Sequence, residues 1–322
     1  MIQEALDKQV CTVGIFIDLT KAYDVLNHKL LLEKLSSYGV RGTTNSWFRS
    51  YLTNRRQFIK INQSDSSNIM VNRYRSSCME IKQGVPQGSV FGLLLFLLYI
   101  NDLPLNIHGA NFVMFTDDIN VLIMGSDVGA LKNKIDRVIT ELETWFNRND
   151  FTINASKTGA MWFYNRQTSF LVKPKVTFNK MNLDYITETK FLGIHITETL
   201  KWNSHVQSLA SNLSKVSFMI KSLKEILSPN MIRNIYFTKF QSLQQVGTLF
   251  WGELGGELNM RILRIQKRAI RSMVGASSRT SCRQLELNIL NLPLLYILEM
   301  TCFVRKYCQS LELNSSVRNY NT

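Results

Sequence analysis

Cysteine, proline and acidic residues are all scarce in this chain of 322 residues, which has five cysteines and five prolines. The cysteines are scattered without Cys-x-x-Cys spacing, so a zinc site is not expected and the thiols are typical of a reducing, intracellular compartment. The longest apolar run, Val90 to Ile100, is shorter than the ~20 residues that span a bilayer. The N-terminus lacks the apolar core of a signal peptide. We therefore expect an intracellular protein, in the nucleus or the cytoplasm, without a membrane segment.

Positive charge is in excess, and most of the excess lies late in the chain. Lys and Arg number 38 against 24 Asp and Glu, which gives a net charge of +14 and a pI near 9.6. From Lys201 onward there are sixteen Lys or Arg, six Glu and no Asp. Such an excess favours a polyanionic partner, either a nucleic acid or an acidic membrane surface. Charge alone fits a solvated helical surface at least as well.

Three carboxylates follow strand-like runs. Asp117 and Asp118 lie between Phe112–Phe115 and Ile119–Ile123, two stretches rich in branched and aromatic residues that predict β-strands. The pair is therefore expected at the tip of a hairpin, although Asp-Asp is also common in ordinary turns. Asp18 ends a similar apolar run. If these strands are neighbours, the three carboxylates can hold two Mg²⁺ ions, because a divalent cation offsets the cost of gathering like charges.

Further signals predict a tight turn and several helices. Gly84–Ser89, with two glycines and a proline, predicts a turn that lets a ligand or another backbone approach closely. Ser89 is expected to cap the helix Val90–Ile100, whose apolar character on all sides predicts full burial. A loop before a core helix is the simpler interpretation of this segment. Asn27 and Asp127 are expected to cap two other helices.

Beyond Leu200 the pattern changes from mixed to helical. At 45% hydrophobic residues, the chain can bury a core and has room for about two domains. Apolar residues recur at helical spacing over Leu209–Leu227, and Ile262–Met273 carries a basic stripe. We expect an α/β domain over residues 1–196 and an all-helical region over 197–322. No large apolar face is expected beside the basic stripe, which disfavours a membrane surface as its partner.

Six segments in order resemble the motifs of reverse transcriptases from non-LTR (LINE-type, jockey-like) retrotransposons, and the resemblance covers almost the whole chain. One such motif could arise by chance, whereas six in order with natural spacing do not. Three match successive palm motifs, one matches the fourth motif, and the rest match the primer grip and the thumb region: Phe16–Asp24, Gly84–Ser89 with Leu94–Pro104, Phe115–Asp118, Asn154–Thr158, Phe191–Ile194 with Leu200–His205, and Phe250–Gly252 with Ile265–Arg271.

The resemblance implies a fold and an activity. The fold would be an α/β polymerase palm, an antiparallel sheet with packed helices and partial fingers elements, followed by a helical thumb. The activity would be that of an RNA-directed DNA polymerase, a nucleotidyltransferase that extends a primer 3′-hydroxyl by two-metal catalysis. Asp18, Asp117 and Asp118 would be catalytic and would hold two Mg²⁺ ions, with Mn²⁺ as a substitute. The implied partners are an RNA template, a DNA primer and deoxynucleoside triphosphates.

The resemblance also implies roles for supporting residues. Tyr23 matches the aromatic gate that clashes with a ribose 2′-hydroxyl and so selects deoxynucleotides. Gln87, with Gly88, would contact the incoming nucleotide, and Lys157 would approach its phosphates. Tyr23 also fits a core aromatic residue and Lys157 a surface lysine in a turn, so both alternatives stay open. The primer grip would consist of three consecutive residues, Phe191, Leu192 and Gly193.

The sequence departs from the family pattern at three positions near the predicted site and in how much of the family's full length it covers. Thr116 stands where the family usually has Ala, Ile119 where it usually has Thr, and Leu93 where Pro is common; none of these removes a ligand. The family's preceding fingers segment and its upstream endonuclease domain are missing from this sequence, so we expect a truncated copy. The alternative function is therefore a catalytically inactive remnant that only binds RNA or an RNA–DNA duplex.

Overall fold

The computed structural model describes residues 1–322 apart from 65–70, 155, 166–171, 253–256, 283–287 and 308–322. The chain forms two compact units, Met1–Thr187 and Glu188–Thr322. The boundary expected from the sequence, after residue 196, lies within the last β-hairpin of the described chain, and this hairpin belongs to the second unit.

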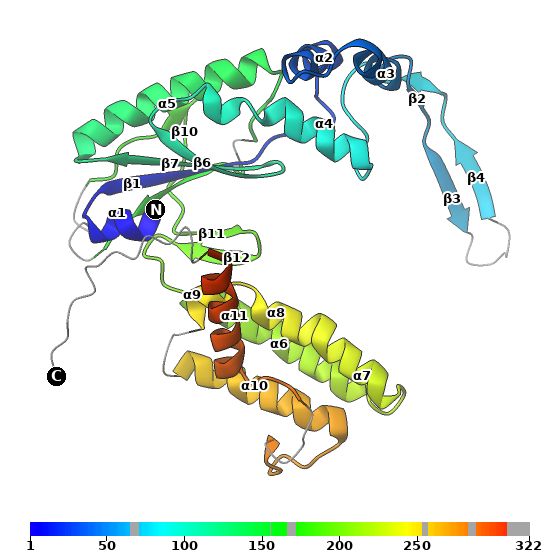
Figure 1. Ribbon diagram of the computed structural model, residues 1–322, viewed down its shortest axis with the longest axis vertical. Helices are drawn as coiled ribbons and strands as arrows, with labels where there is room; N and C mark the ends of the chain where they lie inside the picture. The colour runs from blue at the N-terminus through cyan, green and yellow to red at the C-terminus, as the bar shows by residue number, and fades with distance from the viewer. Residues whose placement is uncertain (65–70, 155, 166–171, 253–256, 283–287, 308–322) are drawn as a thin grey trace. The chain divides into compact units, whose positions relative to one another are not determined.

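A four-stranded antiparallel sheet forms the centre of the first unit, in the order β6-β7-β1-β8 (Figure 1). Its strands are β1 (Cys11–Ile17), β6 (Ala110–Phe115), β7 (Asp118–Gly125) and β8 (Gly159–Phe163). β1 lies between β7 and β8 and is buried over nearly its whole length, which explains why its residues are almost all apolar. β6 is an edge strand whose residues alternate between half-buried and exposed. The two strands predicted to be neighbours, β1 and β7, do pair.

Helices pack on this sheet and complete its hydrophobic core. They are α1 (Ile2–Asp7), α2 (His28–Ser37), α4 (Val90–Ile100), the short 3₁₀ helix η1 (Leu103–Leu105) and α5 (Val128–Arg148). The predicted caps of α2, α4 and α5 are confirmed, because Asn27, Ser89 and Asp127 each accept a hydrogen bond from a backbone N–H of the first turn. Buried residues of α2, α4 and α5 form one cluster with those of β1, β7 and β8.

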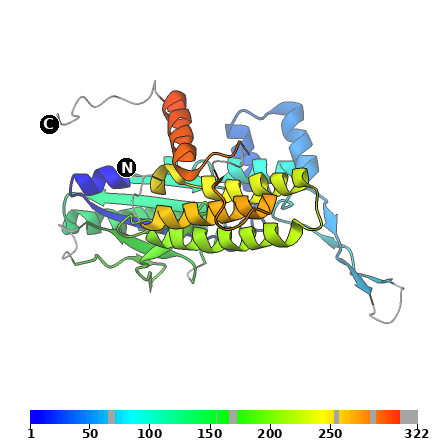
Figure 2. The ribbon, with the colours of Figure 1, turned by 90° about the horizontal axis from the view of Figure 1, so that it is seen from below.

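Smaller elements complete the first unit. α3 (Gly42–Leu52) follows α2, β2 (Arg56–Gln57) pairs with β5 (Met79–Glu80), and β3 (Lys60–Ser64) pairs with β4 (Val71–Arg75). The β3–β4 ribbon projects away from the sheet (Figures 1 and 2). A last pair, β9 (Thr177–Phe178) and β10 (Met181–Asn182), lies against α5.

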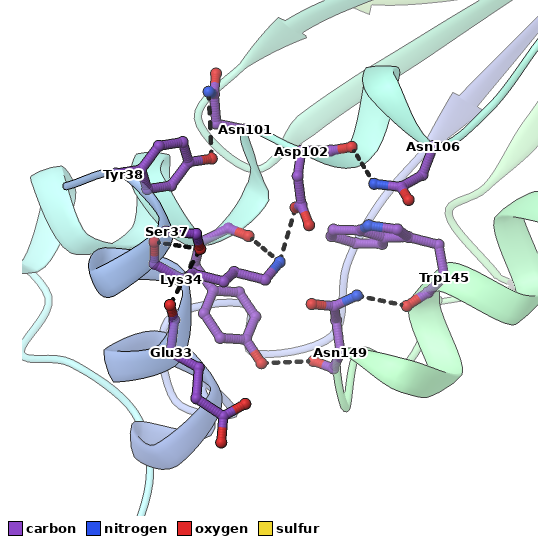
Figure 3. A network of polar contacts seen from close by, with 10 residues as sticks. Glu33, Lys34, Ser37, Tyr38, Asn101, Asp102, Asn106, Trp145 and Asn149 are labelled. Atoms are coloured by element: carbon purple, nitrogen blue, oxygen red, sulfur yellow. Dashed lines mark hydrogen bonds and ion pairs between the residues drawn. The ribbon is translucent and has the colours of Figure 1, made fainter.

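A largely buried lysine joins α2 to the ends of α4 and α5 (Figure 3). Nζ of Lys34 donates to the carbonyl of Tyr99 and to the carboxylate of Asp102, both at 2.7 Å, and lies over the rings of Tyr99 and Trp145. The Tyr99 hydroxyl donates to the carbonyl of Asn149 at 3.1 Å. Burial lowers the pKa of Lys34, and the bond to Asp102 opposes that shift. The network therefore ties α2 to the C-terminal ends of α4 and α5.

The expectation that α4 is buried on every side is wrong. One side of the helix, which includes Leu95 and Phe96, is fully buried in the core. The opposite side is open: Val90 is 86% exposed, and Leu94 and Leu97 are 44% and 41% exposed. The apolar sequence of α4 makes burial of every face favourable. Whether a face is in fact covered depends on which distant segments pack against the helix.

The second unit combines a β-hairpin with helices (Figure 1). β11 (Glu188–Phe191) pairs with β12 (Ile194–Thr197). The helices are α6 (Asn203–Leu223), α7 (Pro229–Ile235), the π-helical segment η2 (Tyr236–Gln241), α8 (Ser242–Gln245), α9 (Thr248–Trp251), α10 (Glu257–Val274) and α11 (Leu292–Tyr307). The predicted basic segment lies in α10, which packs alongside α6.

A mixed fold with antiparallel strands was expected and is confirmed. The finer assignment of a palm and a thumb stays a prediction. Among the helices of the described residues, none combines the length and the apolar character needed to cross a bilayer.

Candidate active site

Asp18 and Asp118 lie at the same end of two neighbouring strands. Ile17, the last residue of β1, pairs with Ile119 of β7 in antiparallel register. Continuing that register by one position places the backbone of Asp18 opposite Asp118, where cross-strand Cβ atoms are typically about 4.5–5.5 Å apart. Asp117 lies in the adjoining two-residue loop of the β6–β7 hairpin. The sheet thus brings residues from distant parts of the sequence to one end.

The carboxylates at this end of the sheet act on one another electrostatically. Partial burial raises the pKa of Asp118, and the negative charges of Asp117 and Asp18 raise it further. Nζ of Lys157 lies 3.8 Å from Oδ2 of Asp18. The side chains of this ion pair are 68% and 38% exposed, so solvent weakens it. A weak ion pair to one of three carboxylates leaves a negative site that favours a further cation.

Backbone hydrogen bonds hold Asp18 against the segment that follows α5. The N–H of Asp18 donates to Oγ1 of Thr158 at 3.2 Å, and its carbonyl accepts from the N–H of Asn154 at 2.9 Å. Thr158 is buried. Lys157 was predicted as a site residue from the sequence, whereas the neighbouring Thr158 was not. The residue lies in the recognised motif, but its partner is 140 positions away, which no local pattern reveals.

Thr116 gives the hairpin loop a strained conformation. Its φ is +52°, which a β-branched residue rarely adopts and which costs about 1–3 kcal/mol. Its hydroxyl donates to Oδ1 of Asp117 at 2.8 Å. The residue that replaces the family's usual alanine therefore orients one of the three carboxylates.

The ring of Tyr23 packs against the core of the first unit. It stacks on Phe96 of α4, with ring centroids 4.6 Å apart. Burial raises the pKa of the Tyr23 hydroxyl, and the negative charge of Asp117 raises it further. The carbonyl of Tyr23 accepts a hydrogen bond from the N–H of Val85 at 2.8 Å. Tyr23 therefore packs against the core while remaining within electrostatic reach of Asp117.

The turn that begins at Gly84 approaches the segment after Asp18 closely. Gly84 has a φ of +82°, and a Cβ there would lie 2.6 Å from the carbonyl oxygen of Asp24, so both backbone angle and space require glycine. Gly88 has a φ of +81° in open surroundings, and Gln87 beside it is exposed. The turn therefore holds its first glycine rigidly and presents Gln87 to solvent.

The predicted primer-grip residues form the tip of the β11–β12 hairpin in the second unit. Phe191 pairs with Ile194, and the two residues between them, Leu192 and Gly193, have φ values of +47° and +85°. Positive φ at both loop positions is typical of a type I′ turn, although leucine adopts this conformation at a cost. Leu192 is 48% exposed. The hairpin thus presents an apolar side chain at its tip.

The donor set fits a hard divalent cation. Asp18, Asp117 and Asp118 offer only carboxylate oxygens, which Mg²⁺ and Mn²⁺ prefer. Burial raises the pKa of Asp118, and the negative charges of Asp117 and Asp18 add to that rise. Over the described ranges, however, no three side chains of His, Cys, Asp or Glu are arranged closely enough to form a ready metal site. The strand register brings the aspartates to one end of the sheet, and their side-chain oxygens are not gathered around one point.

Residues 2–196 match the family described as reverse transcriptase (RNA-dependent DNA polymerase). This segment is more than half of the chain and includes the three aspartates, Tyr23 and the turn at Gly84. The chain therefore belongs to the reverse transcriptase family, as the motifs predicted.

The curated relatives include polymerases of mobile elements. The chain is 25% identical over 289 residues to the probable RNA-directed DNA polymerase from transposon BS of Drosophila melanogaster. It is 24% identical over 294 residues to the RNA-directed DNA polymerase from mobile element jockey of the same species. These alignments cover 85% and 88% of this chain and 30% of each relative, so the chain spans less than a third of their length. The expected kinship with jockey-like elements is confirmed.

Among solved structures, apo telomerase from Candida tropicalis aligns with 98% of this chain and 54% of its own chain. The TM-score is 0.42 and the sequence identity is 14%. A likeness of this degree does not bear on activity or on the arrangement of the two units.

Proposed function

We propose that this chain is the polymerase segment of a retrotransposon reverse transcriptase and adds deoxynucleotides to a DNA primer along an RNA template. The observation that carries the proposal is the register of β1 with β7, which brings Asp18 opposite Asp118 inside the segment that matches the family. Two acids separated by a hundred positions meet at one end of a sheet, where a shared cation offsets their repulsion.

The three aspartates would hold two Mg²⁺ ions, or Mn²⁺ in their place. When bound, such ions lower the pKa of a primer 3′-hydroxyl and neutralise the triphosphate. The protein's own task is to keep the carboxylates in place. Thr158 would do so by accepting a hydrogen bond from the N–H of Asp18, and Thr116 by donating a hydrogen bond to the carboxylate of Asp117. Lys157, beside Asp18, would meet the negative charge of the phosphates.

Selection of the incoming nucleotide would fall to Tyr23 and the Gly84 turn. The Tyr23 ring is backed by Phe96, so it cannot retreat easily from a group that presses against it. A ribose 2′-hydroxyl at that position would clash with the ring, whereas a deoxyribose would fit. Gln87 and Gly88 are exposed on the turn that is bonded to Tyr23 through Val85, and would contact the same nucleotide.

The second unit would serve as the thumb and hold the template–primer duplex. Its helix α10 carries a basic stripe of Arg264, Lys267, Arg268 and Arg271. Such a stripe binds phosphates without reading sequence. The apolar tip of the β11–β12 hairpin, at Phe191, Leu192 and Gly193, would pack against the primer strand. The exposure of Leu192 supports this role.

A remnant that only binds nucleic acid is the second candidate. One observation favours it: the part of the chain that the structure describes holds no ready cluster of three metal-ligating side chains. The basic stripe of α10 would still bind RNA or an RNA–DNA duplex in such a remnant.

A primer-extension assay on a primed RNA template separates the two candidates. With Mg²⁺ or Mn²⁺, the wild-type chain is expected to incorporate deoxynucleotides and Asp18→Asn is expected not to, while both bind the duplex with equal affinity. Absence of incorporation by the wild-type chain with either metal, together with salt-dependent duplex binding, would establish the remnant instead.

A further inference from the structure

Helices α6 and α10 border a cavity on the second unit that shares Arg268 and Arg271 with the basic stripe of α10 and adds residues that the proposed duplex binding does not use. The two helices run side by side in both views (Figures 1 and 2). The cavity measures about 490 Å³, and Phe218 and Lys221 of α6 and Arg268 and Arg271 of α10 line it together with small residues, mostly serines. This volume is within the range of small-ligand sites, roughly 300–1,000 Å³.

The positive charge of the side chains that line the cavity favours binding of an anion. Its lining includes three cationic side chains and no acidic one. Across the described chain, neither Lys221 nor Arg268 has a carboxylate within ion-pair distance, and both side chains are exposed. Two uncompensated cations facing one hollow bind phosphate more readily than a neutral or acidic group.

An exposed aromatic ring stands beside these cations. Phe218 is 72% exposed, although phenylalanine is normally buried. An aromatic platform next to cationic side chains is the arrangement by which proteins hold single-stranded nucleic acids, with a base on the ring and the backbone on the charges. Bases inside a duplex are already stacked on their neighbours, so such a ring gains contact only from an unpaired base.

The far wall of the cavity is held in place by hydrogen bonds. Gly275 ends α10 with a φ of +71°, and the N–H of Ala276 donates to the carbonyl of Arg271 at 3.0 Å. Nε of Arg271 donates to the carbonyl of Thr280 at 2.8 Å. Arg271 is half-buried. The loop after α10 is therefore tied back to the helix, which gives a ligand a preformed wall.

We propose that this cavity binds one unpaired nucleotide of a single-stranded RNA or DNA. The base stacks on Phe218, and a flanking phosphate lies between Lys221 and the arginines of α10. The site consists of residues of the second unit, whereas the three aspartates belong to the first unit, and it requires no metal ion. It deepens the proposed role of the α10 stripe, with which it shares Arg268 and Arg271, because it would hold a single strand whether or not the chain extends a primer.

The test measures fluorescence anisotropy of a labelled twelve-nucleotide oligouridine with the full chain, without divalent metal. Phe218→Ala is expected to weaken binding roughly tenfold, as loss of one stacked base does, and Phe218→Trp is expected to keep it. The double variant Lys221→Gln with Arg268→Gln is expected to reduce the salt dependence, by about 1.4 in the slope of log K against log salt if two phosphate contacts are lost. An abasic strand of equal length is expected to bind wild type as weakly as oligouridine binds Phe218→Ala.

Matched controls lie elsewhere on the same unit. Ile226→Ala removes another exposed apolar side chain, and Lys215→Gln removes another exposed charge of α6; both are expected to bind the strand as wild type does. Asp18→Asn separates the two proposals, since it should lose incorporation and keep strand binding. Unchanged affinity of Phe218→Ala, or equal binding of the abasic strand and oligouridine to wild type, would overturn the inference and leave only a phosphate site.

Discussion

The aspartate end of the first unit and the α6–α10 cavity of the second unit concentrate charge of opposite sign by different means. In the first unit, acids stand on paired strands and on a strained loop, and burial together with their mutual repulsion raises the pKa of Asp118. In the second unit, cations stand on the open faces of two helices, where water screens them. We infer that substitution of one aspartate abolishes nucleotide incorporation outright. Substitution of one cation of the second unit is expected to weaken nucleic-acid binding only by degrees, and the loss depends on salt.

The largest expected effect tests this difference directly. Asp117→Asn is expected to reduce deoxynucleotide incorporation by at least about 10³-fold, because metal-assisted charge stabilisation is worth several kcal/mol. Lys267→Gln, an exposed charge on the basic stripe, is expected to change incorporation only a few-fold, and less at high salt. Steady-state primer extension at two salt concentrations measures both. Losses of incorporation of similar size in Asp117→Asn and Lys267→Gln would show that the two sites do not differ in this way.

The second effect concerns the stability of the Gly84–Ser89 turn. It compares Gly84, which contacts the backbone of Asp24, with Gly88, which lies in open space. Gly84→Ala is expected to lower the free energy of unfolding by about 3 kcal/mol, because a Cβ would press on the carbonyl of Asp24 and φ is positive. Gly88→Ala shares the positive φ but has open space, so it is expected to cost only about 1 kcal/mol. Urea unfolding compares the two; equal losses would show that the close contact with Asp24 is unimportant.

Many local features of the first unit could be predicted, since caps and hydrophobic periodicity depend on nearby residues. Asn27, Ser89 and Asp127 cap their helices as expected. The open side of α4 and the bond between Asp18 and Thr158 could not be predicted, because each depends on which distant segments become neighbours. The same holds for Lys34, whose charge looks like any surface charge in the sequence, yet it is largely buried against Tyr99 and Asp102.

The third effect concerns selectivity at the aspartate end. Tyr23→Val is expected to raise ribonucleotide incorporation relative to deoxyribonucleotide by roughly tenfold, since removal of one steric clash is worth 1–2 kcal/mol. Phe96→Leu, which weakens the support behind the ring, is expected to shift the ratio in the same direction by less. Competition between the two nucleotide types on one template gives the ratio. Unchanged discrimination in Tyr23→Val would leave Tyr23 as a core aromatic only.

The smallest effect lies at the tip of the β11–β12 hairpin. Leu192→Gly is expected to raise the free energy of unfolding of the second unit by up to about 1 kcal/mol, because glycine adopts the positive φ of this turn without strain. If Leu192 contacts a primer, the same variant should extend primers less efficiently while being more stable. Thermal unfolding and primer affinity of Leu192→Gly, measured together, test both expectations. A variant less stable than wild type would show that the Leu192 side chain contributes to packing of the fold.

The pKa of Asp118, followed by ¹³C NMR in the full chain, tests most directly that the three aspartates share one site. We predict a value above the ordinary 3.8 in wild type, a lower value in Asp18→Asn because one like charge is gone, and a fall in wild type when Mg²⁺ is added. A pKa near 3.8 that responds neither to the substitution nor to Mg²⁺ would contradict a shared metal site.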